Sequence, residues 1–227
     1  MKEQLFLTDL ILKPAPSFEN FVTGDNEELL FTLQHLTAGI SVFLWGDAGS
    51  GKTHLLQALA HDHTFYHAQT FPRTMEQLAT YSAGGLFLID DVQDFDEEQQ
   101  TVLFNLYNMW QAHRLQADAF SIVASGNVPP MQMIMREDLR NRLGWGLVYQ
   151  VHLLNDQDCQ DALEKRAREK GLHLSKEVLH WIFTYCPRDI RTLFALLEAL
   201  DAYSLGQQRP ITIPLLKNLI QSKELFQ

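Results

Sequence analysis

The chain has 227 residues, which is enough for one large domain or two small ones. Its 18 Lys and Arg residues against 28 Asp and Glu residues give a net charge of −10, which argues against a basic face for nucleic acid or an anionic membrane. Two cysteines cannot build a disulfide framework, the first residues do not resemble a signal peptide, and no apolar stretch reaches the roughly 20 residues of a membrane helix. We therefore expect a cytoplasmic globular protein that makes no membrane contact.

The first two thirds of the chain predict a parallel α/β sheet. Residues 1–16, interrupted by Pro14 and Pro16, are expected to form a flexible arm. Over residues 17–155, short apolar runs alternate with helical patterns, which indicates parallel strands joined by helices. The expected helices are 27–36, 52–60 and 97–112; the expected strands are 40–45, 65–68, 85–89, 119–124 and 147–153, the last three of them buried.

Residues 156–227 carry only helical patterns and predict a small all-helical domain. Asp156 is the expected N-cap of its first helix, Gly171 the expected stop, and Ser175 the expected start of the second helix. The four expected helices are 156–170, 175–186, 189–205 and 213–225.

The strongest motif lies between an expected strand and an expected helix and matches GxxxxGK[ST]. Its residues are Gly46, Asp47, Ala48, Gly49, Ser50, Gly51, Lys52 and Thr53. Glycines let the backbone wrap around phosphates, and the following helix presents its N–H groups to the anion. In such a loop the lysine reaches the β/γ-phosphates and the hydroxyl meets Mg²⁺. A chance glycine-rich turn is the alternative, but the strand–loop–helix context favours binding of ATP or ADP with Mg²⁺.

Polar residues follow two further buried strands. Asp90 and Asp91 end the run at 85–89, which would place Asp90 beside the Mg²⁺ and Asp91 near an attacking water. An ordinary polar turn is the alternative, and it is stronger for Asp91 because aspartate reaches less far than glutamate. Asn127 ends the next strand in Ser125-Gly126-Asn127, where it would hold the γ-phosphate or the water.

Arginines gather in two places outside these motifs. Several lie in the segment 136–146, just before the last strand, where they are either a solvated helix face or a finger offered to a neighbouring subunit's nucleotide. Arg191 lies at the start of a helix in the helical domain, from which it could lean over the nucleotide.

Taken together, these segments resemble the AAA+ ATPases and, within them, the DnaA clade, over nearly the whole chain. Walker A followed by His54-Leu55-Leu56, the Ile-Asp-Asp of Walker B and the run Arg142-Leu143-Gly144-Trp145-Gly146 are similar to DnaA. Segments 104–108, 190–194 and 210–214 resemble the DnaA-related regulatory inactivators. The resemblance implies an AAA+ P-loop NTPase domain with a parallel sheet, followed by a small helical lid, in a bacterial cytoplasm.

The resemblance also implies roles for single residues. Asn127 falls at the sensor 1 position, Arg142 at the arginine finger with Arg140 as its rival, and Arg191 at sensor 2. The segment 21–26, which includes Val22, resembles the linker that contacts adenine.

The first residues resemble a peptide that binds the sliding clamp, the β subunit of DNA polymerase III. Gln4, Leu5 and Leu7 supply the glutamine and leucines of that peptide, whereas Phe6 and Thr8 depart from the usual pattern. The resemblance therefore implies that this chain, bound to the clamp on DNA, stimulates hydrolysis of ATP on DnaA and prevents re-initiation.

Several other interpretations of the sequence stay open beside the inactivator hypothesis. DNA would be contacted only indirectly through the clamp, and self-association into a homo-oligomer is left open. The first rival is a DnaA-like or helicase-loader ATPase, which would require a basic channel or an interaction domain. The second rival is a P-loop kinase for a small molecule, which would not explain Arg142 before the last strand or the helical domain.

Overall fold

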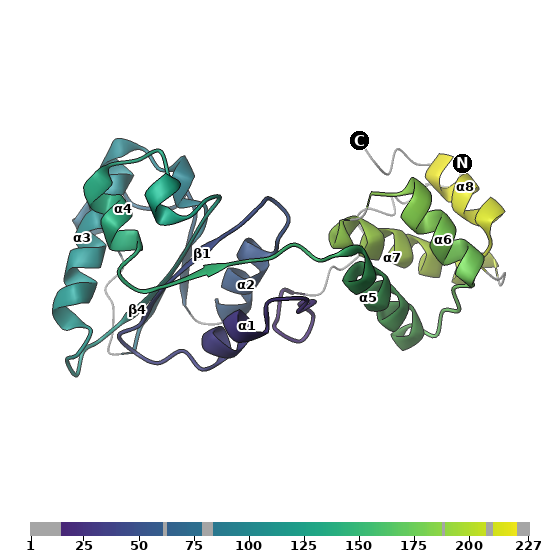
Figure 1. The fold of residues 1–227 in the computed structure, drawn as a ribbon, viewed down its shortest axis with the longest axis horizontal. Helices are drawn as coiled ribbons and strands as arrows, with labels where there is room; N and C mark the ends of the chain where they lie inside the picture. Colours follow the sequence, from purple (N-terminus) through teal and green to yellow (C-terminus); the bar gives the residue numbers. More distant parts are fainter. Residues whose placement is uncertain (1–14, 61–62, 79–83, 188, 208–210, 222–227) are drawn as a thin grey trace, which may run out of the picture. The chain divides into compact units, whose positions relative to one another are not determined.

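A computed structural model describes residues 15–60, 63–78, 84–187, 189–207 and 211–221. The chain divides into two compact units between Leu153 and Leu154. The first unit is an α/β domain and the second is built from helices (Figure 1). None of the helices within these residues is long and apolar enough to cross a membrane.

The first unit is built on a five-stranded sheet in the order β2-β3-β4-β1-β5, in which every neighbouring pair is parallel. The predicted parallel sheet is therefore confirmed. Because all strands run the same way, their carboxyl ends meet at one edge, where ligands bind in open α/β sheets. The strands are β1 (Ser41–Trp45), β2 (Thr64–Tyr66), β3 (Leu86–Ile89), β4 (Ser121–Gly126) and β5 (Leu147–Gln150).

Helices cover both faces of this sheet (Figure 1). One face carries Leu88 and Val123, and it packs against leucines of the first two helices. The other face carries Phe43 and Ile122, and it packs against the third and fourth helices. The helices are α1 (Glu27–Gln34), α2 (Lys52–Leu59), α3 (Glu97–His113) and α4 (Glu137–Leu143). Of these, α4 falls in the arginine-rich segment, for which no helix boundaries were predicted.

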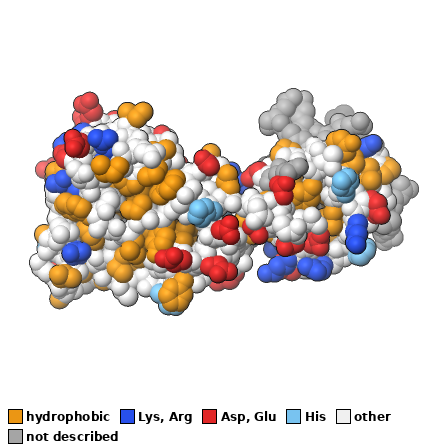
Figure 2. Space-filling view, in the orientation of Figure 1, with side chains coloured by type: hydrophobic (Ala, Val, Ile, Leu, Met, Phe, Trp, Pro, Cys, Tyr) orange, Lys and Arg blue, Asp and Glu red, His pale blue; other side chains and the backbone are white. Residues whose placement is uncertain are grey.

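Strand β5 corrects the expectation of a buried strand over 147–153. It spans only Leu147–Gln150 and, among the residues that the structure describes, pairs only with β1, at the edge of the sheet. Leu147 and Val148 are 43% and 40% exposed because an edge strand packs against fewer neighbours than a central one. Figure 2 shows hydrophobic side chains gathered on the face over which β5 runs.

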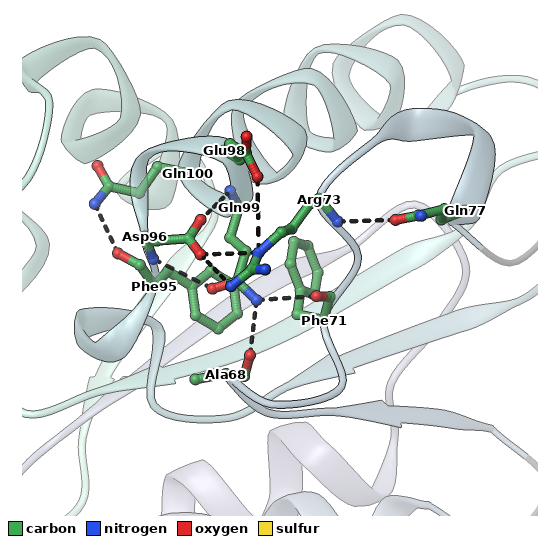
Figure 3. Close-up of polar contacts among 9 residues, drawn as sticks. All are labelled: Ala68, Phe71, Arg73, Gln77, Phe95, Asp96, Glu98, Gln99 and Gln100. Carbon is green, nitrogen blue, oxygen red and sulfur yellow. Dashed lines mark hydrogen bonds and ion pairs between the residues drawn. The ribbon is translucent and has the colours of Figure 1, made fainter.

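A buried glutamine fastens the loop after β2 to the start of α3 (Figure 3). Asp96 and Gln99 form a reciprocal capping box: the Asp96 side chain accepts from Gln99 N–H at 2.9 Å, and Gln99 Oε1 accepts from Asp96 N–H at 3.2 Å. Gln99 Nε2 also donates to the carbonyl oxygens of Ala68 at 2.7 Å and Phe71 at 2.9 Å. Arg73 completes the cluster through an ion pair with Asp96 at 2.8 Å. One side chain thus connects two segments that are about thirty residues apart in sequence.

We expect Gln99→Ala to lower the free energy of unfolding by about 1–3 kcal/mol. The Gln99 side chain is only 3% exposed, and its removal leaves the buried carbonyl groups of Ala68 and Phe71 without their donor. Urea titration followed by circular dichroism measures this loss. The matched control is Gln100→Ala, which removes a single bond to the Phe95 carbonyl and should cost less than about 1 kcal/mol. Equal losses in the two variants would contradict the anchoring role of Gln99.

The second unit confirms the predicted all-helical domain. Its core is built from apolar side chains of all four helices, including Leu163, Leu179, Leu193 and Leu216. The helices are α5 (Asp156–Glu169), α6 (Lys176–Tyr185), α7 (Ile190–Gln207) and α8 (Ile213–Gln221).

The ends of these helices mostly follow the predicted signals. Asn155, and not Asp156, caps α5, since the Asn155 side chain accepts from the Asp158 N–H at 2.9 Å. Gly171 takes a φ of 70° just after α5 ends, and Ser175 caps α6. Cys159 and Cys186 are buried in the core of this unit, and burial raises the pKa of both thiols.

Candidate functional site

The glycine-rich loop lies between β1 and α2, at the carboxyl edge of the sheet. Gly49 and Gly51 have φ values of 86° and 103°, a left-handed conformation that other residues adopt at a cost. A Cβ on Gly51 would lie 2.6 Å from Cε2 of Phe21, and one on Gly46 would lie 2.5 Å from the Val151 carbonyl oxygen. The glycines are therefore required by both conformation and space, and they lead directly into the first turn of a helix, where N–H groups point toward an anion.

Lys52 is the buried cation of this loop, with 7% of its surface exposed. Its Nζ donates to the carbonyl oxygens of Gly46 at 2.7 Å and Asp47 at 3.0 Å. Burial lowers the pKa of the Lys52 ammonium, while the carboxylates of Asp91, Asp90 and Asp47 act in the opposite direction. The lysine is thus held among the loop carbonyls, where a phosphate cradled by the loop would meet it.

Asp90 lies against the same loop. Its Oδ1 accepts a 2.5 Å hydrogen bond from the Ser125 hydroxyl, and the Thr53 hydroxyl also bonds its carboxylate. Burial raises the pKa of the Asp90 carboxyl, and the two hydroxyl donors partly offset this effect. One carboxylate next to one hydroxyl suits Mg²⁺, which takes few protein ligands and completes its shell with phosphates and water.

Asp91 has an unusual backbone, with the left-handed φ of 52°. Its N–H donates to Ser125 Oγ at 2.9 Å, and Gln93 Nε2 donates to its Oδ1 at 3.1 Å. Strain of this kind concentrates at functional sites, because surrounding contacts must hold it in place. Ser125 therefore bonds both acidic residues, one through its hydroxyl proton and the other through its oxygen.

Ser125 is a site residue that sequence reasoning passed over in favour of Asn127. Asn127 follows the end of β4 and is exposed, whereas Ser125 is fully buried beside the acidic pair. Its signal in the sequence was a hydroxyl near the end of an apolar strand, but only the adjacency of β3 and β4 gives that hydroxyl its partners.

The segment expected to contact adenine lies close to the loop. Phe21 packs tilted against His54, with ring centroids 5.5 Å apart, and His54 Nε2 lies 2.9 Å from the Ser17 carbonyl oxygen. Val22 is half-buried beside Phe21. Asn26 is held by the backbone of His152, accepting from its N–H at 2.8 Å and donating to its carbonyl at 3.1 Å. The segment is therefore fixed at both ends within the α/β unit.

Arg142 is held on α4 by contacts on several sides. Its Nε donates to Asn108 Oδ1 at 2.8 Å, and its Nη1 donates to the Asp138 carbonyl at 2.9 Å. The guanidinium lies 3.7 Å from the ring centroid of Phe104 and 5.0 Å from that of Trp145. The planar guanidinium of an arginine is better suited to these stacking and hydrogen-bonding contacts than the ammonium of a lysine.

Arg140, the rival finger, is less strongly held. Its Nη1 lies 3.4 Å from the Met131 carbonyl oxygen, and its buried Nε has no hydrogen-bond partner among the described residues. Neither arginine is fully solvated.

The remaining predicted residues lie elsewhere. Arg191 belongs to the helical unit, where its side chain is 76% exposed and its Nε lies 3.5 Å from Asp189 Oδ1. Gln4, Leu5 and Leu7 lie outside the described residues.

Comparisons with known proteins bear on this arrangement. Residues 156–220 match the family model described as the lid domain of Hda. The fold is similar to domain III of the replication initiation protein DnaA from Thermotoga maritima, at 20% identity and a TM-score of 0.66 over 92% of this chain and 97% of that one. It is also similar to AMPPCP-bound DnaA from Aquifex aeolicus, at 23% identity and a TM-score of 0.66 over 88% of this chain and 70% of that one.

A curated protein of Haemophilus influenzae, described as uncharacterised, is 29% identical over 217 residues. The alignment covers 90% of this chain and 93% of the relative. The similarity therefore extends through both units and is not confined to the nucleotide-binding motifs.

Proposed function

We propose that this chain, a DnaA-related AAA+ protein whose residues 156–220 match the lid domain of Hda, is a regulatory inactivator of the initiator DnaA in the bacterial cytoplasm. The lid match is the observation that carries the proposal, because it separates this chain from AAA+ proteins that share only the nucleotide-binding motifs. In this role the protein stimulates hydrolysis of ATP held by DnaA and so limits re-initiation of replication.

In this proposal, the P-loop of this chain binds ADP or ATP together with Mg²⁺. Lys52 and the left-handed glycines support phosphate binding, and Thr53 with Asp90 supports a Mg²⁺ site. A bound Mg²⁺ supplies positive charge to the phosphates. Val22 and its neighbours contact the base, and Asn127 and Arg191 act as the two sensors of the nucleotide. The DnaA of Aquifex aeolicus, a structural neighbour, is bound to AMPPCP, which is consistent with this assignment.

In this proposal, Arg142 acts on the ATP that is bound to DnaA. A permanently charged guanidinium stabilises the charge of a transferring phosphoryl group. Asn108 and Phe104 support this role, because they restrict the side chain before a partner arrives and so reduce the entropy lost on binding.

The clamp is the second proposed partner, reached through Gln4, Leu5 and Leu7 in the arm at 1–16. We expect the double variant Gln4→Ala/Leu7→Ala to lose clamp binding, since a buried leucine alone contributes about 1.5–3 kcal/mol. Surface plasmon resonance on immobilised clamp measures the binding, and titration with fluorescent ADP checks that the fold and nucleotide site persist.

The matched control is Glu3→Ala, which changes the same arm outside the glutamine and leucine positions. The wild-type chain with DNA-loaded clamp should accelerate hydrolysis of DnaA-bound ATP, and the double variant should not. Full clamp binding by the double variant would place the contact elsewhere. A wild-type chain that leaves DnaA-bound ATP intact in the presence of loaded clamp would remove the inactivator function.

A further inference from the structure

The net charge of −10 is unevenly distributed along the chain. Residues 15–153, which form the α/β unit, contain 16 Asp and Glu residues against 6 Lys and Arg residues, whereas the two signs balance in residues 154–227. Salt at physiological strength largely screens charges that are more than about 8 Å apart, so the local charge decides what a surface attracts. The negative total therefore argues against a basic face on the α/β unit but not on the helical unit.

Three exposed cations of the helical unit lie near the end of α5 and at the start of α6, and Figure 2 shows Lys and Arg side chains gathered over α5. We call them the basic patch; its residues are Lys165, Arg168 and Lys176. Lys165 and Arg168 are three residues apart on α5, so they are neighbours on the helix surface. Within the described part of the chain, none of the three side chains forms an ion pair or a hydrogen bond.

Two further cations of α5 and its end are already paired with carboxylates. Lys170 Nζ lies 2.7 Å from Glu198 Oε2 and 3.3 Å from Asp201 Oδ2, and Arg166 Nη2 lies 3.8 Å from Glu198 Oε1. Glu169 Oε2 lies 3.7 Å from Arg166 Nη1. These carboxylates are therefore engaged by Arg166 and Lys170, which leaves the charge of the basic patch available to a partner.

Stabilisation of the helix dipole is the alternative explanation for the basic patch. Arg168 lies in the last turn of α5, where a cation favours the helix and requires no partner. Lys165 precedes that turn, and Lys176 is the first residue of α6, where a cation opposes the dipole. Glu177 supplies the acidic residue that the first turn of α6 favours. Helix stability thus accounts for one of the three cations.

The composition of the basic patch favours a phosphate backbone over a protein surface as its partner. Protein interfaces are anchored by large apolar side chains, whereas interfaces with nucleic acid are more polar and more positively charged. Of the large hydrophobic side chains that the structure describes as exposed, none lies between residues 165 and 176. Contacts of lysine and arginine with phosphate oxygens carry no sequence information, so the patch would accept any duplex.

We propose that the basic patch binds the phosphate backbone of the DNA duplex that passes through the clamp. The inference rests on the proposed function for the source of the duplex, because a chain that sits on a loaded clamp has DNA within reach. It goes beyond that function, since the sequence predicted DNA contact only through the clamp. Three cations bind weakly on their own, but attachment to the clamp makes the contact intramolecular, at an effective concentration on the order of millimolar.

The first test uses the chain without the clamp and measures the fluorescence anisotropy of a labelled duplex at low salt. For three phosphate contacts, the logarithm of the binding constant should fall against the logarithm of the salt concentration with a slope of about −2.7. The triple variant Lys165→Ala/Arg168→Ala/Lys176→Ala should lose about tenfold or more in affinity, and each single change should reduce the slope by about 0.9. The matched control Lys217→Ala removes an exposed lysine of α8 and should change neither quantity.

The circular dichroism spectrum and the affinity for ADP should stay unchanged in these variants, because the side chains removed are exposed. Wild-type affinity for the duplex in the triple variant would overturn the inference, and so would a wild-type chain that binds no duplex at low salt. A triple variant that keeps duplex binding but loses self-association would overturn it as well, since the patch would then meet the acidic α/β unit of a second copy.

A second measurement separates this contact from the proposed clamp contact. Surface plasmon resonance should show about three- to tenfold tighter binding of the wild-type chain to DNA-loaded clamp than to free clamp. The triple variant should bind both forms equally and keep its affinity for free clamp. Equal binding of the wild type to both forms would overturn the inference. A wild-type chain that binds the duplex but neither form of the clamp would instead remove the proposed clamp partner and leave DNA binding by the patch standing.

Discussion

Arg142→Ala should abolish the acceleration of ATP hydrolysis on DnaA while leaving ADP binding and clamp binding intact. Arginine fingers in well-studied GTPases contribute about 10³–10⁵ in rate, so the loss should exceed any other effect expected here. The measurement is hydrolysis of radiolabelled ATP on DnaA, reconstituted with DNA-loaded clamp. Acceleration by the variant at the wild-type rate would remove Arg142 from the mechanism.

The contacts of Arg142 require a control for structure, because its removal also frees Asn108 and uncovers Phe104. Arg136→Ala is matched: Arg136 lies 5.3 Å from the same Phe104 ring and forms a 2.7 Å ion pair with Asp138. The Arg136→Ala variant should still accelerate ATP hydrolysis on DnaA. A loss of acceleration in both variants would therefore indicate that the local structure is disrupted. Loss in Arg140→Ala alone would move the finger two residues upstream.

Lys52→Ala should weaken ADP binding by about ten- to hundred-fold, because one charged hydrogen-bonding partner of the phosphates contributes about 1.5–3 kcal/mol. The lysine is buried and directed into the loop by the carbonyls of Gly46 and Asp47, and these two groups cannot supply a replacement cation. Titration of the variant with fluorescent ADP measures the change.

The charge-matched control is Lys176→Ala, which removes an exposed lysine from the helical unit and should bind ADP as wild type does. Circular dichroism of both variants separates a binding defect from unfolding. An unchanged ADP affinity in Lys52→Ala would contradict the assignment of the phosphate site.

The phosphate-binding loop was predictable because its structure is encoded locally. Eight consecutive residues specify the strand end, the left-handed glycines and the first turn of α2, and Lys52 follows from their spacing. Asp90 was predictable for a similar reason: an acidic residue ending a buried strand lies at the carboxyl edge whichever neighbours that strand has. The α/β sheet and the helical unit followed from hydrophobic periodicity alone.

The remaining features depend on which segments become neighbours in space. The role of Ser125 requires β4 to lie beside β3, and Gln93 contacts Asp91 across a short turn whose first residue, Asp91, is itself left-handed. The exposure of β5 depends on its place at the border of the sheet. Neither strand order nor such a turn can be read from the period of a single segment, because both are set by tertiary packing.

Asn26 has a consequence for the solubility of the α/β unit. Val151 N–H donates to the Trp45 carbonyl on β1, so the N–H and carbonyl groups of the next residue, His152, face away from β1. The Asn26 side chain bonds both of these groups at the open border of the sheet. The border strand itself, Leu147–Gln150, contains no charged residue and no proline, the usual deterrents against addition of a foreign strand. This border is therefore protected by its shortness and by one buried amide, which occupies the site where an incoming strand would next have paired.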